Sequence, residues 1–207
     1  MKKQLLLSCI LLGVSTLSQA QPISLEYQSF YQRLKQVNKG NYQLVEIAFS
    51  VSKANGCKVK NGTITTENDE FPLTITKDQR LFLPYDGQLK SDRALINLNV
   101  EGDAQTCAIA MQVRAKNTKQ LYEQAELVQI EQEMNALLSQ MQGFPMRYFA
   151  SDIAGLNLEF DGDATVYIDD KAIPVTGTYR LETSQLAGLK SLKTSVAPKV
   201  ISPWTVK

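Results

Sequence analysis

Cys57 and Cys107 are the residues of this sequence whose chemistry is the easiest to state. They do not form a Cys-x-x-Cys motif, and the chain has no histidine that could activate a catalytic thiolate. Cys9 lies in the first twenty residues, which we expect to be removed on export, so these two are the cysteines of the mature chain. An even pair of cysteines in an exported chain indicates a disulfide. Closing a loop of about 50 residues would stabilise the fold by about 4 kcal/mol. We therefore expect a Cys57–Cys107 disulfide, and two unpaired buried thiols are the alternative.

The absence of histidine excludes several kinds of active site. Ser-His-Asp and Cys-His catalytic arrangements cannot be built. Zinc sites that use histidine cannot be built either, and two cysteines are too few for an all-cysteine site, which needs four thiolates. We therefore expect no metal site and no cofactor, and any catalysis would have to use carboxylates, Lys, Tyr, Ser or Thr.

Glu159 and Asp161 are the two carboxylates with the spacing best suited to acid/base chemistry. Two positions apart on an expected strand, they would share one face at roughly 6–7 Å. Carboxylate pairs at such separations act in glycosidases. The alternative, which we favour, is a solvated hairpin face, because Asp161-Gly162-Asp163 is an ordinary turn sequence.

The densest polar stretch covers residues 85–93, and it could be a recognition loop, since loops on rigid sheets often carry function. The alternative is a solvated connection whose charges pair with one another. The candidate recognition residues are Tyr85, Asp86, Lys90, Asp92 and Arg93.

The first twenty residues have the composition of a cleavable secretory signal peptide. Lys2 and Lys3 form a short basic segment, residues 5–17 are mostly apolar, and residues 18–20 end in the small-residue pattern that signal peptidase recognises. The apolar segment is shorter than the roughly 20 residues that a membrane span needs. We expect a periplasmic mature chain of residues 21–207. An uncleaved anchor and lipidation at Cys9 are the alternatives.

The expected mature chain is almost neutral. Removal of Lys2 and Lys3 leaves 20 basic residues against 21 acidic ones. This balance disfavours nucleic-acid binding, because no basic excess exists to neutralise phosphates. No later stretch is long and apolar enough to be a transmembrane segment. The length suits a single domain over 21–207, and a subdivision into 21–116 and 117–207 is the alternative.

Hydrophobic periodicity predicts the elements that must position these residues. An apolar stripe predicts a helix over 25–39, and capping residues with a broad apolar face predict a long helix over about 118–142. About six short strands are expected between residues 43 and 116, followed by a hairpin around residues 161–163, another strand over 171–181 and a short helix from Thr183. This is an α+β class: an antiparallel sandwich-like or barrel-like block, an amino-terminal helix, one long helix and a second, smaller β region.

The carboxyl-terminal tail, residues 196–207, combines two prolines with several apolar residues. Pro198 and Pro203 each lack a backbone donor, so the tail should not be a central strand. Its apolar residues nevertheless make a free terminus implausible. We expect an extended segment along a sheet edge or over the core, anchored by Trp204; the alternative is a tail displayed for a partner.

Several idiosyncratic segments of the chain carry a resemblance to a protein family. They are Leu25-Glu26-Tyr27, residues 31–35, 81–86 and 89–94, Gln142-Gly143-Phe144-Pro145 and residues 198–204. On these segments the whole mature chain resembles an uncharacterised family of exported Gram-negative bacterial proteins, a domain of unknown function. The resemblance implies a periplasmic or envelope address and supplies no activity and no site residues.

These observations predict an exported periplasmic or envelope-associated binding or accessory module, with an envelope protein or ligand as its partner, rather than an enzyme. One alternative is a carboxylate-dependent hydrolase acting on envelope glycan, for which Glu159 and Asp161 should converge in a cleft. The other is a lipid carrier, which needs an apolar cavity enclosed by the sheet and the long helix.

Overall fold

The middle of the molecule is an antiparallel sheet whose strands alternate apolar and polar residues. The structure is a computed structural model that describes residues 21–101, 104–105, 107–143, 145 and 151–206. Strands β5 (Thr74–Ile75), β6 (Arg80–Phe82), β2 (Val45–Val51) and β8 (Ile109–Ala115) pair in this order. The odd-numbered residues of β2 are buried, and Phe49 packs edge-on against Phe30 of helix α1 (Tyr27–Gly40). The even-numbered residues of β2 therefore form the opposite, polar face.

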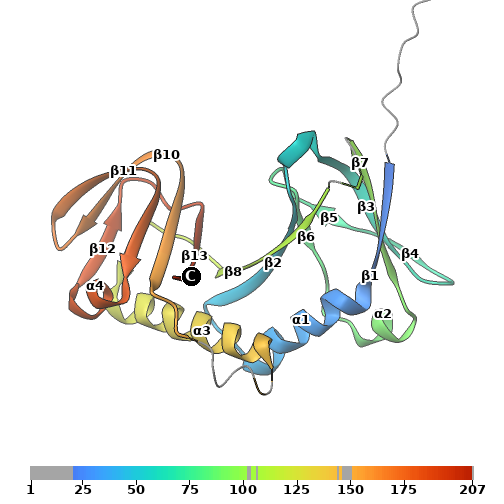
Figure 1. Ribbon diagram of the computed structural model, residues 1–207, viewed down its shortest axis with the longest axis horizontal. Helices are drawn as coiled ribbons and strands as arrows, with labels where there is room; N and C mark the ends of the chain where they lie inside the picture. Colours follow the sequence, from blue (N-terminus) through green and yellow to red (C-terminus); the bar gives the residue numbers. More distant parts are fainter. Residues whose placement is uncertain (1–20, 102–103, 106, 144, 146–150, 207) are drawn as a thin grey trace, which may run out of the picture.

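Two further antiparallel sheets flank the middle sheet. On one side, β1 (Gln21–Glu26), β7 (Leu95–Glu101), β3 (Lys58–Thr65) and β4 (Glu70–Pro72) pair in this order. On the other side the order is β11 (Lys171–Glu182), β10 (Gly155–Ile168), β12 (Ser191–Thr194) and β9 (Leu121–Glu123), and β13 (Val200–Trp204) also pairs with β10. Because β3 contacts β5 and β13 contacts β8, the sheets follow one another in an arch (Figure 1).

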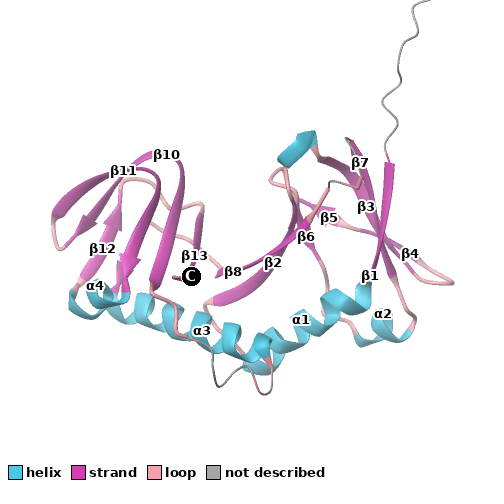
Figure 2. Cartoon of the chain, viewed as in Figure 1, coloured by secondary structure: helices cyan, strands magenta, loops and turns pink. Residues whose placement is uncertain are grey.

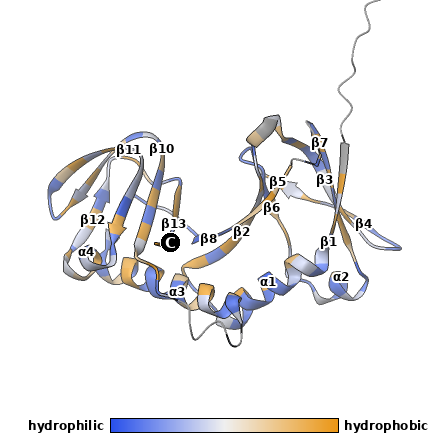
Figure 3. Ribbon diagram, in the orientation of Figure 1, coloured by the Kyte–Doolittle hydropathy of each residue, from blue (hydrophilic) through white to orange (hydrophobic). Residues whose placement is uncertain are grey.

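The α-helices of the described residues cover one side of this arch, and the 3₁₀ turn lies away from them (Figure 2). Helix α1 and helix α3 (Gln124–Gln142) are the long ones, and α2 (Gly87–Ser91), α4 (Thr183–Gly188) and the 3₁₀ turn η1 (Ala54–Gly56) are short. Helix α3 buries Leu127, Ile130, Met134 and Leu137, at the spacing of one helical face. Figure 3 shows hydrophobic and hydrophilic residues alternating along this helix and the strands. The buried residues form one cluster that includes positions on both sides of residue 117.

The structure confirms the predicted α+β class and changes several elements within it. The sheets are antiparallel, and the described strands do not close into a barrel. The predicted helix over 25–39 begins later, because residues 21–26 form β1, which pairs with β7. The long helix also begins later, at Gln124, after strand β9. The predicted signal peptide and the Cys9 alternative lie outside the described residues.

The predicted hairpin around residues 161–163 is wrong. Strand β10 continues through this segment, and a register shift against β11 between Glu159 and Asp163 accommodates Asp161 and Gly162 as a bulge. The chain reverses instead at Asp169 and Asp170, which both have left-handed backbone angles. Asp is one of the residues that tolerates this conformation, so residues 161–163 and residues 169–170 both have the composition of a turn. The pairing of β10 with β11 determines that the chain reverses at residues 169–170.

The carboxyl-terminal tail is extended along a sheet edge, as predicted. Residues 200–204 form β13, which pairs along one side with β10 within the described part of the chain. Pro203 is tolerated because only one side of the strand is hydrogen-bonded. The anchor, however, is Ile201, which is fully buried, whereas Trp204 is only partly buried beneath the guanidinium of Arg180.

This difference gives a prediction for two matched substitutions in one strand. Ile201→Ala should lower the free energy of unfolding by about 2–5 kcal/mol, because it removes buried methyl groups and leaves a cavity. Trp204→Ala should cost less, about 1–2 kcal/mol, because part of the indole already contacts solvent. Urea unfolding of the two variants measures both values, and a larger loss for Trp204→Ala would contradict the assignment of Ile201 as the anchor.

Candidate functional site

A pocket of about 310 Å³ lies on the polar face of the middle sheet, the face opposite the helices. Strands β2, β6 and β8 supply its floor, and Lys199 and Val200, where β13 begins, supply one wall. Its lining includes three cations and one carboxylate, together with small polar groups. These residues are Ala48, Ser50, Thr76, Asp78, Arg80, Gln112, Arg114, Lys199 and Val200.

The floor of the pocket holds two arginines that share a single carboxylate oxygen. Nη2 of Arg80 lies 2.7 Å from Oε1 of Glu46, and Nε of Arg114 lies 3.5 Å from the same oxygen. The three side chains are 20–22% exposed. Strand register explains the cluster, since Glu46 pairs with Arg114 across β2 and β8, and Arg80 pairs with Ser50 on the other side of β2.

The hydrogen-bonding capacity of this cluster is incompletely used. Oε1 of Glu46 and the Nε atoms of Arg80 and Arg114 are buried, and none makes an aligned hydrogen bond with the described residues. Burial lowers the pKa of Arg114, as does the neighbouring charge of Arg80, whereas Glu46, Glu159 and Asp78 act in the opposite direction. The guanidinium of Arg114 is thus a partly desolvated cation with one long ionic contact.

Lys199 joins the wall of the pocket to its rim through ion pairs. Its Nζ lies 2.8 Å from Asp161 and 3.4 Å from Asp78, and Asp78 also pairs with Lys53 at 3.1 Å. The hydrogen bond from Lys53 and the nearby charge of Lys199 lower the pKa of Asp78. The hydrogen bond to Asp161 raises the pKa of Lys199. These exposed pairs contribute little to stability and set the charge pattern at the rim.

Glu159 and Asp161 have separate partners. Oε1 of Glu159 accepts a hydrogen bond from the Ser202 hydroxyl at 3.1 Å, whereas the largely exposed Asp161 pairs with Lys199. The bulge in β10 begins directly after Glu159, so the regular alternation that would align the two side chains is interrupted there. The carboxylates of Glu159 and Asp161 therefore bind different neighbours and do not form a pair.

The candidate recognition residues surround α2 and lie against α1 rather than in the pocket. Tyr85 stacks on Tyr31 with ring centroids 4.9 Å apart, and Lys90 lies 5.8 Å from the centre of the same Tyr31 ring. Asp86 caps α2 by accepting hydrogen bonds from the backbone amides of residues 88 and 89. Two of the five therefore share one aromatic neighbour, and Asp86 has a structural role.

The remaining two candidate residues follow α2. Asp92 accepts a hydrogen bond of 2.7 Å from the Gln88 side chain, and Arg93 has a left-handed backbone. Arg93 also lines a separate pocket of about 390 Å³ with Glu26 and Gln28. A recognition role for this loop stays a prediction.

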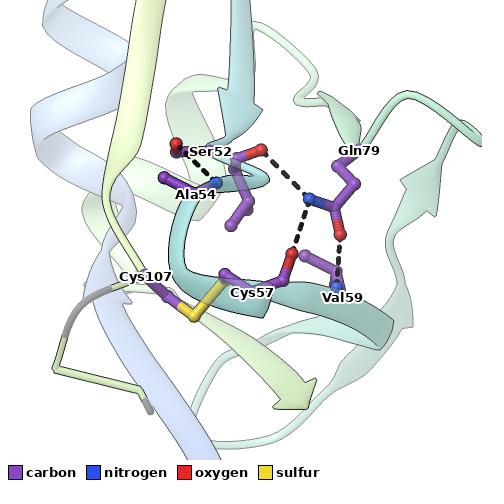
Figure 4. Close-up of a disulfide and its surroundings, with 7 residues drawn as sticks. Ser52, Ala54, Cys57, Val59, Gln79 and Cys107 are labelled. Carbon is purple, nitrogen blue, oxygen red and sulfur yellow. Dashed lines mark hydrogen bonds between the residues drawn. A yellow bond between two sulfur atoms is a disulfide. The ribbon is translucent and has the colours of Figure 1, made fainter. Parts of the chain in front are cut away.

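The disulfide joins Cys57 to Cys107, as the sequence predicts, with their Cα atoms 5.6 Å apart. It links the segment entering β3 to the segment entering β8, and therefore two different sheets. Figure 4 shows Gln79 beside it, with its side-chain amide between the ends of β2 and β3.

Gln79 is a buried polar residue that sequence reasoning missed. Its Nε2 donates to the carbonyls of Val51 and Cys57 at 3.2 Å each, and its Oε1 accepts from the amide of Val59 at 2.6 Å. Its backbone is left-handed, in the turn that connects β5 to β6. Gln79 thereby fixes the turn that presents Asp78 and Arg80 to the pocket.

The pocket cluster was also missed, because Glu46, Arg80 and Arg114 are far apart in the sequence and form no local motif. Glu46 follows the ordinary alternation of β2, as any outward-facing polar residue would, so this strand alone gave no signal for the cluster. Among the described residues, no group of three or more potential ligands is arranged to hold a metal ion. In the same part of the chain, every helix is too short or too polar to cross a membrane.

Comparison with known proteins gives a family and no further relative. Neither a curated protein nor a solved structure matches the chain. A family pattern matches residues 19–160, which include the pocket floor and both disulfide cysteines but not Lys199 or β13. Because this match covers more than half of the 207 residues, the chain belongs to the family described as protein of unknown function (DUF2987).

Proposed function

We propose that this protein is an exported, periplasmic or envelope-associated binding module that holds its ligand or partner against the polar face of the arch. The observation that carries the proposal is the pocket on this face, whose floor has two partly buried arginines around one carboxylate. Concave sites with a few convergent polar groups are typical of ligand binding. The disulfide supports an oxidising compartment, where such bonds persist.

Three further features favour this proposal over other functions. Glu159 and Asp161 each have a different partner, which is not the arrangement of two carboxylates acting on one glycosidic bond. Fully buried side chains of α3 occupy the region between this helix and the sheets, where a lipid carrier would need an apolar cavity. The near-neutral charge of the expected mature chain gives no support to a nucleic-acid partner.

Affinity purification of the tagged protein from envelope extracts tests the proposal. The exported protein should have an intact mass that begins at Gln21, and it should enrich a partner or ligand reproducibly. Ser50→Trp, which places an indole in the pocket, should abolish this enrichment. The matched control is Ser29→Trp on the exposed side of α1, which should leave the enrichment unchanged.

The same assay separates the pocket from the loop around α2. Lys90→Glu reverses the charge above Tyr31 without touching the pocket. If Lys90→Glu loses the enrichment and Ser50→Trp keeps it, the binding surface is the loop around α2 and not the pocket. An intact mass that retains residues 1–20 would contradict the export of a mature chain.

A further inference from the structure

The two arginines on the pocket floor have more donor capacity than their surroundings use. Among the described residues, Glu46 is the single ionic contact of Arg114, and it is a long one at 3.5 Å. The guanidinium of Arg80 contacts both Glu46 and the ring of Phe82, whose centre is 4.5 Å away. Partly buried guanidinium groups are usually satisfied by paired, bidentate hydrogen bonds to oxyanions. Two guanidiniums with one shared carboxylate oxygen therefore lack an acceptor.

The nearby carboxylates do not supply that acceptor. Asp78 and Asp161 are held by Lys53 and Lys199 at the rim. Glu159 contributes to the electrostatic environment of Arg114, but its contact is with the Ser202 hydroxyl. Every acidic group around the pocket therefore has a closer partner than Arg114, and this includes Glu46, whose shared oxygen lies nearer to Arg80.

We propose that Arg80 and Arg114 together bind the oxyanion of a small acidic ligand, a carboxylate or a phosphate group, in competition with Glu46. This inference rests on the proposed binding function and names the chemistry of the ligand. Ser50, Thr76 and Gln112 line the same pocket and offer hydrogen bonds to polar substituents of the ligand, and Lys199 adds a third cation at the wall. At about 310 Å³, the pocket has the size of a small-molecule site.

Glu46 has a defined role in this arrangement. Its oxygen occupies the space between the two guanidiniums and acts as an internal counter-ion. An incoming oxyanion takes over the contact to Arg114, the longer of the two, while Glu46 keeps its 2.7 Å contact to Arg80. Removing the charge of Glu46 should therefore strengthen binding of an acidic ligand, whereas removing Arg114 should weaken it.

An NMR titration of the ¹⁵N-labelled mature chain tests the proposal. The probes are inorganic phosphate and D-glucuronate at constant ionic strength, with glucose as the uncharged control. The Nε–H signals of Arg80 and Arg114 are suitable reporters, because both Nε atoms are buried. At least one acidic probe should shift both signals saturably, and glucose should not. The probe that does so identifies the source of the oxyanion as a phosphate or a carboxylate.

The variants give opposite expected changes in affinity. Arg114→Gln should weaken binding by at least about tenfold, which is the effect of one lost hydrogen bond to a charged group. Glu46→Gln should tighten it by about two- to fivefold. Arg180→Gln, an arginine on the neighbouring sheet that does not line the pocket, should change nothing. If Arg114→Gln fails to fold, Arg114→Lys, which keeps the charge and loses the planar fork, should still bind more weakly than wild type.

The proposal is overturned if neither acidic probe shifts the arginine signals, or if folded Arg114→Gln or Arg114→Lys binds the probes as wild type does. Weaker binding of the acidic probes by Glu46→Gln than by wild type would overturn the competition with Glu46 as well. Failure of the probes combined with partner enrichment that Ser50→Trp abolishes would leave the proposed binding function in place and remove the oxyanion. Probe binding without any enriched partner or ligand would support the oxyanion site and contradict the enrichment expected from the proposed function.

Discussion

Gln79→Ala should lower the free energy of unfolding by about 3–5 kcal/mol, a large effect for one uncharged side chain in a turn. The substitution removes the partners of the Val51 and Cys57 carbonyls and of the Val59 amide. Each buried group left without a hydrogen bond costs about 1–3 kcal/mol, and water entering the gap reduces the total. Urea unfolding, followed by the fluorescence of Trp204, measures the loss.

Gln79→Gly is the matched control, because the native backbone of residue 79 is left-handed. Glycine adopts this conformation without steric cost but also lacks the amide. Both variants should therefore be much less stable than wild type, with the glycine variant the less damaging of the two by about 1 kcal/mol. Stability within about 0.5 kcal/mol of wild type for either variant would show that the amide does not connect the two sheets.

Replacing the disulfide with Cys57→Ser and Cys107→Ser should cost about 4 kcal/mol. The bond closes a loop with a sequence separation of 50, and loop-closure entropy gives this magnitude. Reduction of the wild-type protein should give a similar loss, which separates the cross-link from the effect of the serine hydroxyls. The unreduced, denatured protein should contain no free thiol.

The disulfide and Gln79 should be energetically coupled, because Gln79 bonds to the carbonyl of Cys57 itself. In a double-mutant cycle of Gln79→Ala with the cysteine pair, the combined loss should differ from the sum of the separate losses by at least about 0.5 kcal/mol. Additive losses would mean that the two features stabilise the junction independently. Free Cys57 and Cys107 thiols in mature protein isolated without reductant would contradict the cross-link.

Features that depend on local pattern could be predicted from the sequence. The alternation in β2 follows from residues 45–51 alone, and the long helix follows from the apolar spacing of residues such as Met134 and Leu137. The disulfide followed from the expectation of an exported mature chain, in which Cys57 and Cys107 are the two remaining cysteines. The helix and strand predictions use residues within one element. The disulfide prediction needs no knowledge of the fold, because each cysteine of the expected mature chain has one possible partner.

The features that were missed depend on which strands become neighbours. Glu46 and Arg114 meet because β2 and β8 pair in one register, and a shift by one residue would place them on opposite faces. Gln79 looks like any polar turn residue until β2 and β3 are placed beside it. The Asp-Gly-Asp segment of β10 has the composition of a turn, and only its pairing with β11 makes it a bulge. Non-local pairing is therefore the information that the sequence pattern lacks.

Strand β13 has a consequence for the order in which the molecule assembles. It follows all the other described elements in the sequence, yet it pairs with β10 and contacts β8, so it joins two of the sheets. Contacts between such distant segments form late, after local elements have already been built. A chain that emerges from its amino-terminal end can complete the first and middle sheets while the tail is still absent. The wall that carries Lys199 is then the final part of the pocket to arrive, so a nascent chain has the arginine floor before it has an enclosed site.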